Sequence, residues 1–498
     1  MRRAPTRRNV ISTLASLPAG VAHARNVEYR LSRFGGIADG SIDGRGTDNG
    51  PALRALLKAA ATSGGGRLII EPGIYCFDGT LACVSPAIAD LVIEGWGAAL
   101  IGRKSVAEPG DHFFHIRHPA DDGGALTIAG LELAMARPSV RTSNVDMLLV
   151  EGFRSTLLDG LKIPCADNMG VSFDRRSSRF WVPEEIIGRN LDIGGRKFEK
   201  PHSHGSIGDS GIWIPRGAKW IDINARIQST GDDACYLGPI PEKHGDPVVR
   251  AAFRLNLTTY KTVGAFHVEM PNGVLTGTAD TTLTAAVACN PALDGAPSAR
   301  IDNIRVNVDI RNAGMLAPKD IGAFSIPQVN SCGIWLYGAG RNIDLTGTQM
   351  KNINGPAVLL QAKSGQVLEA IAGQLTLDRI LVNASGGPKG GDGAVIKRSA
   401  TGTGVVRRVN LSLTVRNSNC PIVSWLQTGP NDDSDITVQA NLANSRLDRR
   451  AYAGKELANF YAAGPGAPKR VRLNFGGATG TQRLQLGGKA HRDNFVVR

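Results

Sequence analysis

An aspartate and a pair of aspartates about one solenoid coil apart are the strongest candidates for catalytic residues in this sequence. Asp209 precedes the apolar segment 211–214, and Asp232 and Asp233 precede the similar segment 234–237, 23 or 24 residues later. If the chain coils with that period, corresponding residues of adjacent coils stack about 4.8 Å apart. Carboxylates brought together raise the pKa of at least one of them, as general acid catalysis near neutral pH requires. The alternative is that aspartates at the corners of the coils only cap backbone amides.

A cluster of basic residues surrounds Asp209 in the sequence. It consists of Lys200, His202, His204 and Arg216. A histidine base together with a cation that binds a carboxylate would suit a uronate lyase or epimerase. A solvated loop between coils is the other interpretation of the same residues.

Aromatic residues follow the aspartates at alternating positions. Trp213 and Tyr236 occupy the same place in the two segments, and Trp335 repeats the pattern later in the chain. Such rings either stack on sugar rings in a groove or pack against each other. We take Trp213 and Tyr236 as candidate substrate-binding residues.

The segment that should position these residues begins with a capped helix. Residues 51–61 form an amphipathic helix with an early proline and an apolar stripe, and the helix ends at three consecutive glycines. The stripe comprises Leu53, Leu56, Leu57 and Ala60. A short strand at 67–70 and a turn leading to Tyr75 follow. Laid across the end of a stack of strands, this helix would cover exposed backbone groups and core.

The order of these elements resembles the N-terminal cap and first coil of the pectate-lyase-like superfamily. Short apolar strands then recur at roughly the spacing of a solenoid coil, separated by Gly, Asn and Asp. Examples are 91–93, 126–128, 148–150, 170–173, 220–223, 304–306, 343–345, 395–396, 409–411 and 436–438. The segment 211–214 is echoed by 333–336, an offset that suggests five coils. The predicted fold is all-β, a single-stranded right-handed parallel β-helix with an N-terminal capping helix.

The aspartate cluster also resembles the polygalacturonases and related rhamnogalacturonan hydrolases of that superfamily. Their motifs are Asn-Thr-Asp, Gly-Asp-Asp, Gly-His-Gly and Arg-Ile-Lys. Gly231-Asp232-Asp233 matches the second motif, and Asp209 matches the last residue of the first, where Ile207-Gly208 replaces Asn-Thr. His267 is the nearest candidate for the third motif. Arg300-Ile301-Asp302 supplies the arginine of the fourth but carries Asp instead of the sugar-binding Lys.

The resemblance implies a role for each of the carried-over residues. Asp232 would be the general acid, while Asp209 and Asp233 would hold the attacking water. His267 would belong to the catalytic group. Arg300 would bind substrate. Independently of the resemblance, His204 and Arg216 of the basic cluster are further candidate substrate-binding residues.

The N-terminal 24 residues have the pattern of an export signal. Four arginines precede a weakly apolar stretch and the small-x-small site Ala22-His23-Ala24, and Arg7-Arg8 resembles a twin-arginine signal. We therefore expect a periplasmic or secreted protein. The remaining chain divides into a cap region over 25–66, the β-helix over 67–446, and a C-terminal cap and tail over 447–498 with a helix at 454–462.

Composition narrows the range of partners. The net charge is +13, which favours a polysaccharide that carries negative charge as the partner. The basic residues are scattered without interleaved aromatics, which argues against nucleic acid. No segment has the ~20 apolar residues that span a membrane. Three aspartates could hold Ca²⁺ through their oxygens, although no dedicated calcium loop is present. We expect neither a metal nor another cofactor.

Three functions fit the sequence. The first is an exported enzyme that hydrolyses glycosidic bonds with the aspartate cluster, which supplies one protonated carboxyl and one ionised carboxylate. The second is a uronate lyase or epimerase that uses the nearby His and Arg residues. The third is a β-helix that binds polysaccharide without catalysis. The oligomeric state is left open by the sequence.

Overall fold

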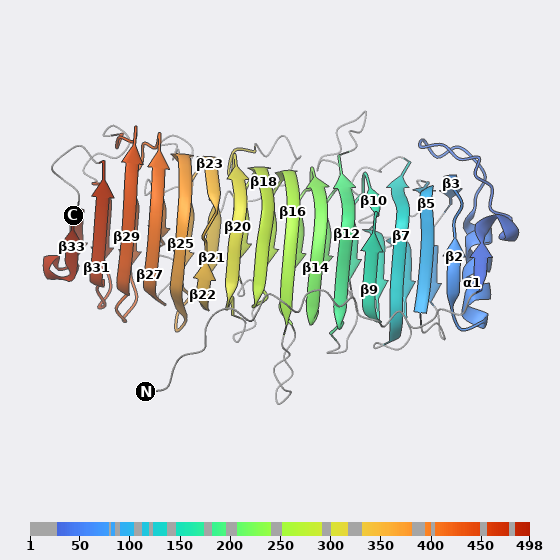
Figure 1. The fold of residues 1–498 in the computed structure, drawn as a ribbon, viewed down its shortest axis with the longest axis horizontal. Helices are drawn as coiled ribbons and strands as arrows, with labels where there is room; N and C mark the ends of the chain where they lie inside the picture. The colour runs from blue at the N-terminus through green and yellow to red at the C-terminus, as the bar shows by residue number, and fades with distance from the viewer. Residues whose placement is uncertain are drawn as a thin grey trace, which may run out of the picture.

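The chain folds into one long stack of parallel β-strands capped by a helix (Figure 1). The computed structural model describes residues 27–78, 81–84, 90–103, 112–118, 123–136, 146–173, 182–195, 207–240, 251–290, 300–316, 331–380, 394–399, 404–448, 456–477 and 484–498. The predicted signal segment 1–24, His202 and His204 lie outside these residues. No helix in the described part of the chain has the length and apolar character of a membrane span.

One parallel sheet carries the short strands that bear the candidate site. Its members pair in chain order, each with the corresponding strand of the next coil. They are β4 (Leu81–Val84), β6 (His112–Arg117), β8 (Asp146–Glu151), β11 (Val171–Phe173), β13 (Ile212–Ile214), β15 (Cys235–Leu237), β17 (Phe266–Val268), β19 (Val287–Cys289), β21 (Ile334–Tyr337), β24 (Val358–Gln361), β26 (Ile396–Arg398), β28 (Val423–Gln427), β30 (Ala458–Ala462) and β32 (Leu484–Gly488).

A second parallel sheet contains the longer strands seen in the foreground of Figure 1. They are β1 (Glu28–Arg30), β2 (Gly66–Ile69), β3 (Gly73–Phe77), β5 (Asp90–Gly102), β7 (Gly123–Met135), β9 (Phe153–Asp159), β10 (Lys162–Ile163), β12 (Glu185–Gly194), β14 (Trp220–Gln228), β16 (Ala252–Thr262), β18 (Gly273–Thr282), β20 (Ile304–Arg311), β22 (Gly340–Asp344), β23 (Gln349–Ile353), β25 (Val367–Ile380), β27 (Val405–Arg416), β29 (Ser434–Ala443), β31 (Lys469–Gly476) and β33 (Phe495–Val497). Short 3-10 helices, Leu31–Phe34 and Arg492–Asn494, lie near the two ends.

The core is a continuous apolar column between the two sheets. Alternate residues of each strand point inward, as in β14, where Ile221, Ile223, Ala225 and Ile227 are buried. Corresponding side chains of successive coils therefore stack on each other. This arrangement confirms the predicted all-β, right-handed parallel β-helix.

The corners of the coils explain the abundance of Asn and Gly. Asn272, Asn303 and Asn342 occupy one column, and each has a left-handed backbone with φ of 57–59°. The Asn303 amide donates to Asn272 Oδ1 over 2.8 Å, and the Asn342 amide donates to Asn303 Oδ1 over 2.9 Å. Asparagine tolerates this conformation and adds a side-chain ladder along the stack.

The predicted capping helix is present as α1 (Gly50–Thr62). All four residues of its predicted stripe, Leu53, Leu56, Leu57 and Ala60, are buried. The Gly50 amide donates to Asp48 Oδ1 over 3.0 Å, so Asp48 satisfies one of the free amides at the start of the helix. The helix therefore closes the N-terminal end of the core.

Two details of the predicted organisation are wrong. The repeated segments are four coils apart, not five, because Ile212 pairs with Cys235, then Phe266, Val287 and Ile334 along coils of unequal length. The expected helix at 454–462 is a strand over Ala458–Ala462. There β30 to β33 extend both sheets, so the β-helix continues beyond residue 446 into the segment 447–498.

Candidate functional site

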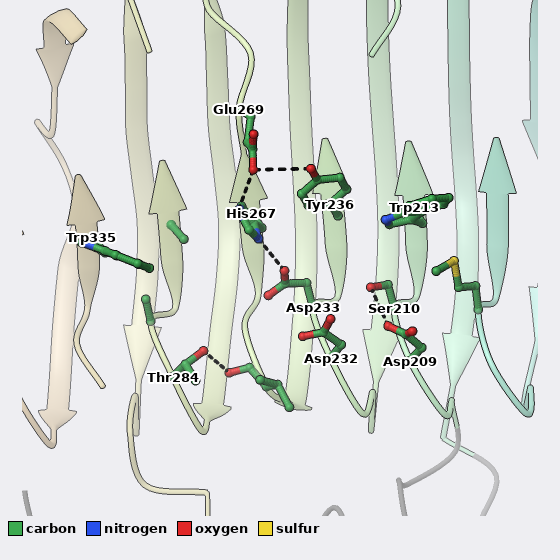
Figure 2. A pocket seen from close by; sticks show the side chains of 14 residues that line it. Asp209, Ser210, Trp213, Asp232, Asp233, Tyr236, His267, Glu269, Thr284 and Trp335 are labelled. Carbon is green, nitrogen blue, oxygen red and sulfur yellow. Dashed lines mark hydrogen bonds and ion pairs between the residues drawn. The ribbon is translucent and has the colours of Figure 1, made fainter. Parts of the chain in front are cut away.

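A cleft of about 530 Å³ opens along the sheet of short strands (Figure 2). Its lining includes four carboxylates, one histidine and three large aromatic rings. The lining residues are Met169, Asp209, Ser210, Trp213, Asp232, Asp233, Tyr236, Val263, His267, Glu269, Thr284, Ala285, Ala288 and Trp335. All four predicted catalytic residues therefore meet in one cleft.

The aspartates come together because adjacent coils are in register. Ile212 pairs with Cys235 and Ile207 pairs with Thr230, so Asp209 lies one coil before Asp232. Figure 2 shows the carboxyl groups of Asp209, Asp232 and Asp233 as neighbours at the corner that precedes β13 and β15. The predicted stacking of these residues is correct.

The local backbone also explains one departure from the hydrolase motif. Gly208 stands where the motif has Thr, and a Cβ at Gly208 would lie 1.9 Å from the carbonyl oxygen of Asp167 in the preceding coil. This corner therefore admits only glycine without rearrangement. One coil later, Thr230 Oγ1 donates to the backbone oxygen of Asp232 over 2.6 Å and fixes the turn that presents the Asp pair.

The aspartates differ in how readily they ionise. Asp232 is exposed at the open cleft, while other acidic groups and protein atoms crowd its carboxyl group. The resulting desolvation, followed by repulsion from Asp233 and Asp209, raises the pKa of Asp232 well above its ordinary value. Desolvation also raises the pKa of Asp209, with smaller contributions from Asp146 and Asp233. Of Asp209 and Asp232, Asp232 is thus the carboxyl group whose protonated form is favoured more strongly.

His267 lies between two carboxylates. Its Nδ1 is 2.7 Å from Asp233 Oδ2, and its Nε2 is 3.4 Å from Glu269 Oε1. Burial of the ring opposes its charge, but attraction to Asp233 and contacts with Glu269 prevail and raise the pKa of His267 to about 10. His267 is consequently a cation at neutral pH and pairs with Asp233.

This ion pair should make stability depend on pH. The folded protein keeps the His267 proton above pH ~6.5, where the unfolded chain loses it, so the contribution is full below that pH and vanishes as pH rises through about 10. We expect the melting temperature of the wild type to fall between pH 7 and 10 more steeply than that of His267→Gln. Equal slopes in thermal unfolding curves of the two proteins would contradict this.

The predicted aromatic residues line the cleft on either side of the acids. The rings of Trp213 and Tyr236 are nearly parallel, with centroids 6.4 Å apart and an interplanar angle of 22°. Trp335 lies at the opposite end, and its Nε1 donates to Gln361 Oε1 over 2.9 Å, which fixes the indole. These aromatic rings therefore pack against neighbouring side chains and also line the cleft.

The predicted cations are not brought into the cleft. Arg216 and Arg300 are described but are not among the lining residues. Arg300 is exposed and pairs with Asp302 at 3.2 Å, and Asp302 also pairs with Arg341 at 3.2 Å. The Asp that replaces the motif lysine thus engages Arg300 away from the site. His204 lies outside the described residues.

Glu269 is the main lining residue that sequence reasoning missed. It follows His267 by two positions, directly after the end of β17, so the alternation of an extended chain places both side chains on the same side. The two-residue spacing from His267 was the feature of the sequence that could have identified Glu269 as a lining residue. Among the described residues, no group of three or more His, Cys, Asp or Glu side chains is arranged to hold a metal ion.

Close packing around Asp233 gives a testable consequence. A Cβ at Gly264, in the next coil, would lie 2.2 Å from Asp233 Oδ1, although the backbone of Gly264 does not need glycine for its φ. Gly264→Ala should therefore displace Asp233 from His267, and any reaction that uses Asp233 should slow by about 10²-fold, as misplacement near 1 Å does. Gly476→Ala, whose Cβ would have no contact under 3.7 Å, is the matched control for initial-rate assays. Equal rates of the two variants would refute the argument.

Comparisons with known proteins return similar folds only. No family model and no curated protein matches the chain. The A-module of a mannuronan C-5 epimerase of Azotobacter vinelandii is 13% identical, with a TM-score of 0.47 over 84% of this chain and 99% of that one. The family 28 exopolygalacturonase of Yersinia enterocolitica is 11% identical, with a TM-score of 0.42 over 89% and 78%. The endo-xylogalacturonan hydrolase of Aspergillus tubingensis is 11% identical, with a TM-score of 0.37 over 93% and 100%. At this level of similarity, activity does not transfer from one protein to another.

Proposed function

We propose that this protein is a glycoside hydrolase that cleaves a polysaccharide bound in the cleft. The observation that carries the proposal is the pairing of two chemically different carboxyl groups in adjacent positions. Asp232 has a raised pKa, whereas Asp233 is held by the His267 cation at 2.7 Å. Hydrolysis of a glycosidic bond needs this combination of a protonated and an ionised carboxyl group.

The proposed reaction assigns one role to each side chain. Asp232 donates its proton to the glycosidic oxygen as the bond to the leaving sugar breaks. A water held by Asp233 and Asp209 attacks the anomeric carbon, and Asp233 accepts the proton of that water. Trp213, Tyr236 and Trp335 offer aromatic faces to the sugar rings.

The lyase and epimerase alternatives have less support. Each needs an unprotonated base to remove the proton at C5, together with a cation that binds the uronate carboxylate. His267 is already protonated between Asp233 and Glu269. Arg216 and Arg300 do not line the cleft.

A substrate screen distinguishes the three functions. Purified protein is incubated with neutral and anionic polysaccharides, and new reducing ends and ultraviolet absorbance are followed together. Reducing ends without absorbance of unsaturated uronates support hydrolysis. Unsaturated products support a lyase, and exchange of C5 hydrogen for deuterium without cleavage supports an epimerase. Binding with no turnover on any polymer would leave a carbohydrate-binding protein.

We also propose that the protein reaches the periplasm or the exterior through the twin-arginine route. That route carries proteins already folded, and the six cysteines whose side chains are described are all buried in the core, as in a protein that folds before export. Replacing Arg7 and Arg8 with Lys should retain the protein in the cytoplasm, as measured by cell fractionation. Unchanged export of the double variant would refute the route.

A further inference from the structure

Glu269 is a buried carboxylate that the proposed reaction does not use directly. Its side chain is 1% exposed, and Oε1 lies 3.4 Å from both His267 Nε2 and the Tyr236 hydroxyl. Its other oxygen, Oε2, is buried without a hydrogen-bond partner. Burying a carboxylate in this way is unfavourable, so a compensating electrostatic role is expected.

The histidine beside Glu269 shows what that role is. Both ring nitrogens of His267 lie near carboxylate oxygens. Nδ1 is hydrogen-bonded to Asp233 Oδ2, whereas the buried Nε2 approaches Glu269 Oε1 to 3.4 Å as an ion-pair contact without hydrogen-bond geometry. An imidazole that faces acceptors on both sides is most stable when both nitrogens carry hydrogen. Figure 2 shows this chain from Glu269 through His267 to Asp233.

The other groups around His267 leave Glu269 as the second carboxylate in contact with it. The preceding coil contributes Asp232, Asp233 and Tyr236, whose ring meets His267 edge to face at 4.8 Å. The next coil contributes Ala288, which carries no charge. Asp233 alone would leave Nε2 free to lose its proton, since Nδ1 could still donate to Asp233 from a neutral ring.

We propose that Glu269 is a positioning residue that keeps His267 doubly protonated and directs its Nδ1–H at Asp233. The imidazolium thereby holds in place the Asp233 side chain that accepts the proton of water. The catalytic role given to Asp233 rests on the proposed function, but the protonation of His267 can be measured in the protein without substrate.

The test is a pH titration of histidine-labelled full-length protein by NMR, without any sugar. The His267 signal is assigned from its disappearance in His267→Gln. In the wild type we expect His267 to remain an imidazolium at pH 8. In Glu269→Gln, which keeps the shape and removes the charge, the midpoint should fall by about 1–3 pH units. Tyr236→Phe is the control, because it removes the other contact of Glu269 Oε1 and leaves the charge in place.

Each outcome decides the proposal. A wild-type His267 that titrates near its ordinary value overturns it, even if Glu269→Gln fails to fold. An unchanged midpoint in Glu269→Gln, or an equal fall in Tyr236→Phe, also overturns it. If Glu269→Gln is unstable, Glu269→Asp retains the charge at shorter reach and should leave His267 protonated at pH 8. Failure of the substrate screen would not affect this titration, so the two proposals fail independently.

Discussion

Replacement of Asp232 by Asn should lower the rate of polysaccharide hydrolysis by about 10²- to 10⁴-fold, the usual contribution of a general acid. The amide has nearly the same shape, so the cleft should stay intact, but it cannot supply a proton to the leaving oxygen. The raised pKa of Asp232 is the reason for assigning the proton to this carboxyl rather than to Asp233. Initial rates of wild type and variant measure the effect.

Two controls separate acid catalysis from general damage to the site. Asp222→Asn changes a partly exposed aspartate on the other sheet, where it pairs with Arg254, and should leave the rate unchanged. A substrate whose aryl leaving group needs no proton should restore most of the activity of Asp232→Asn and little of that of Asp233→Asn. Equal rescue of both variants would contradict the assigned roles.

The second large effect concerns stability. Arg398 and Asp433 form a fully buried ion pair at 3.2 Å inside the solenoid. Asp433 also accepts from Trp425 Nε1 and the Val406 amide, and Arg398 donates to the Gly404 carbonyl. Asp433→Asn would leave a buried guanidinium without its counter-charge, so we expect a loss of about 3–5 kcal/mol in the free energy of unfolding.

A nearby exposed pair provides the matched control for denaturant unfolding. Asp435 pairs with Arg470 at the surface, where their side chains are 42% and 65% exposed. Because exposed pairs contribute at most about 1 kcal/mol, Asp435→Asn should change stability little. If the two Asn variants unfold at the same denaturant concentration, the buried pair does not have the importance assigned to it.

The fold was predicted from the resemblance of the N-terminal segment to the pectate-lyase-like superfamily together with the recurring strands, and the periodicity alone predicted that the three aspartates meet. One coil separates Asp209 from Asp232, with no insertion between them, so spacing alone brings them together. His267 is different, because the segment 241–250 lies between it and Asp233 and hides the period. Only the motif resemblance indicated it, and its contact with Asp233 required the structure.

Other features could not be predicted because tertiary contacts decide them. Arg398 occupies an inward position of β26, where an apolar residue is the ordinary expectation, and it is tolerated only because Asp433 is buried beside it. The segment 454–462 has helical composition, yet pairing with β28 makes its residues 458–462 the strand β30. Intrinsic propensity is weak compared with such pairing.

The most direct test of the central claim is the mass of the products released from the best polymer of the screen. If the cleft hydrolyses glycosidic bonds with Asp232 as the acid, each cleavage adds the mass of one water, and the products disappear with Asp232→Asn. Products that lack this added water and carry an unsaturated sugar, or hydrolysis that persists undiminished in Asp232→Asn, would contradict the account.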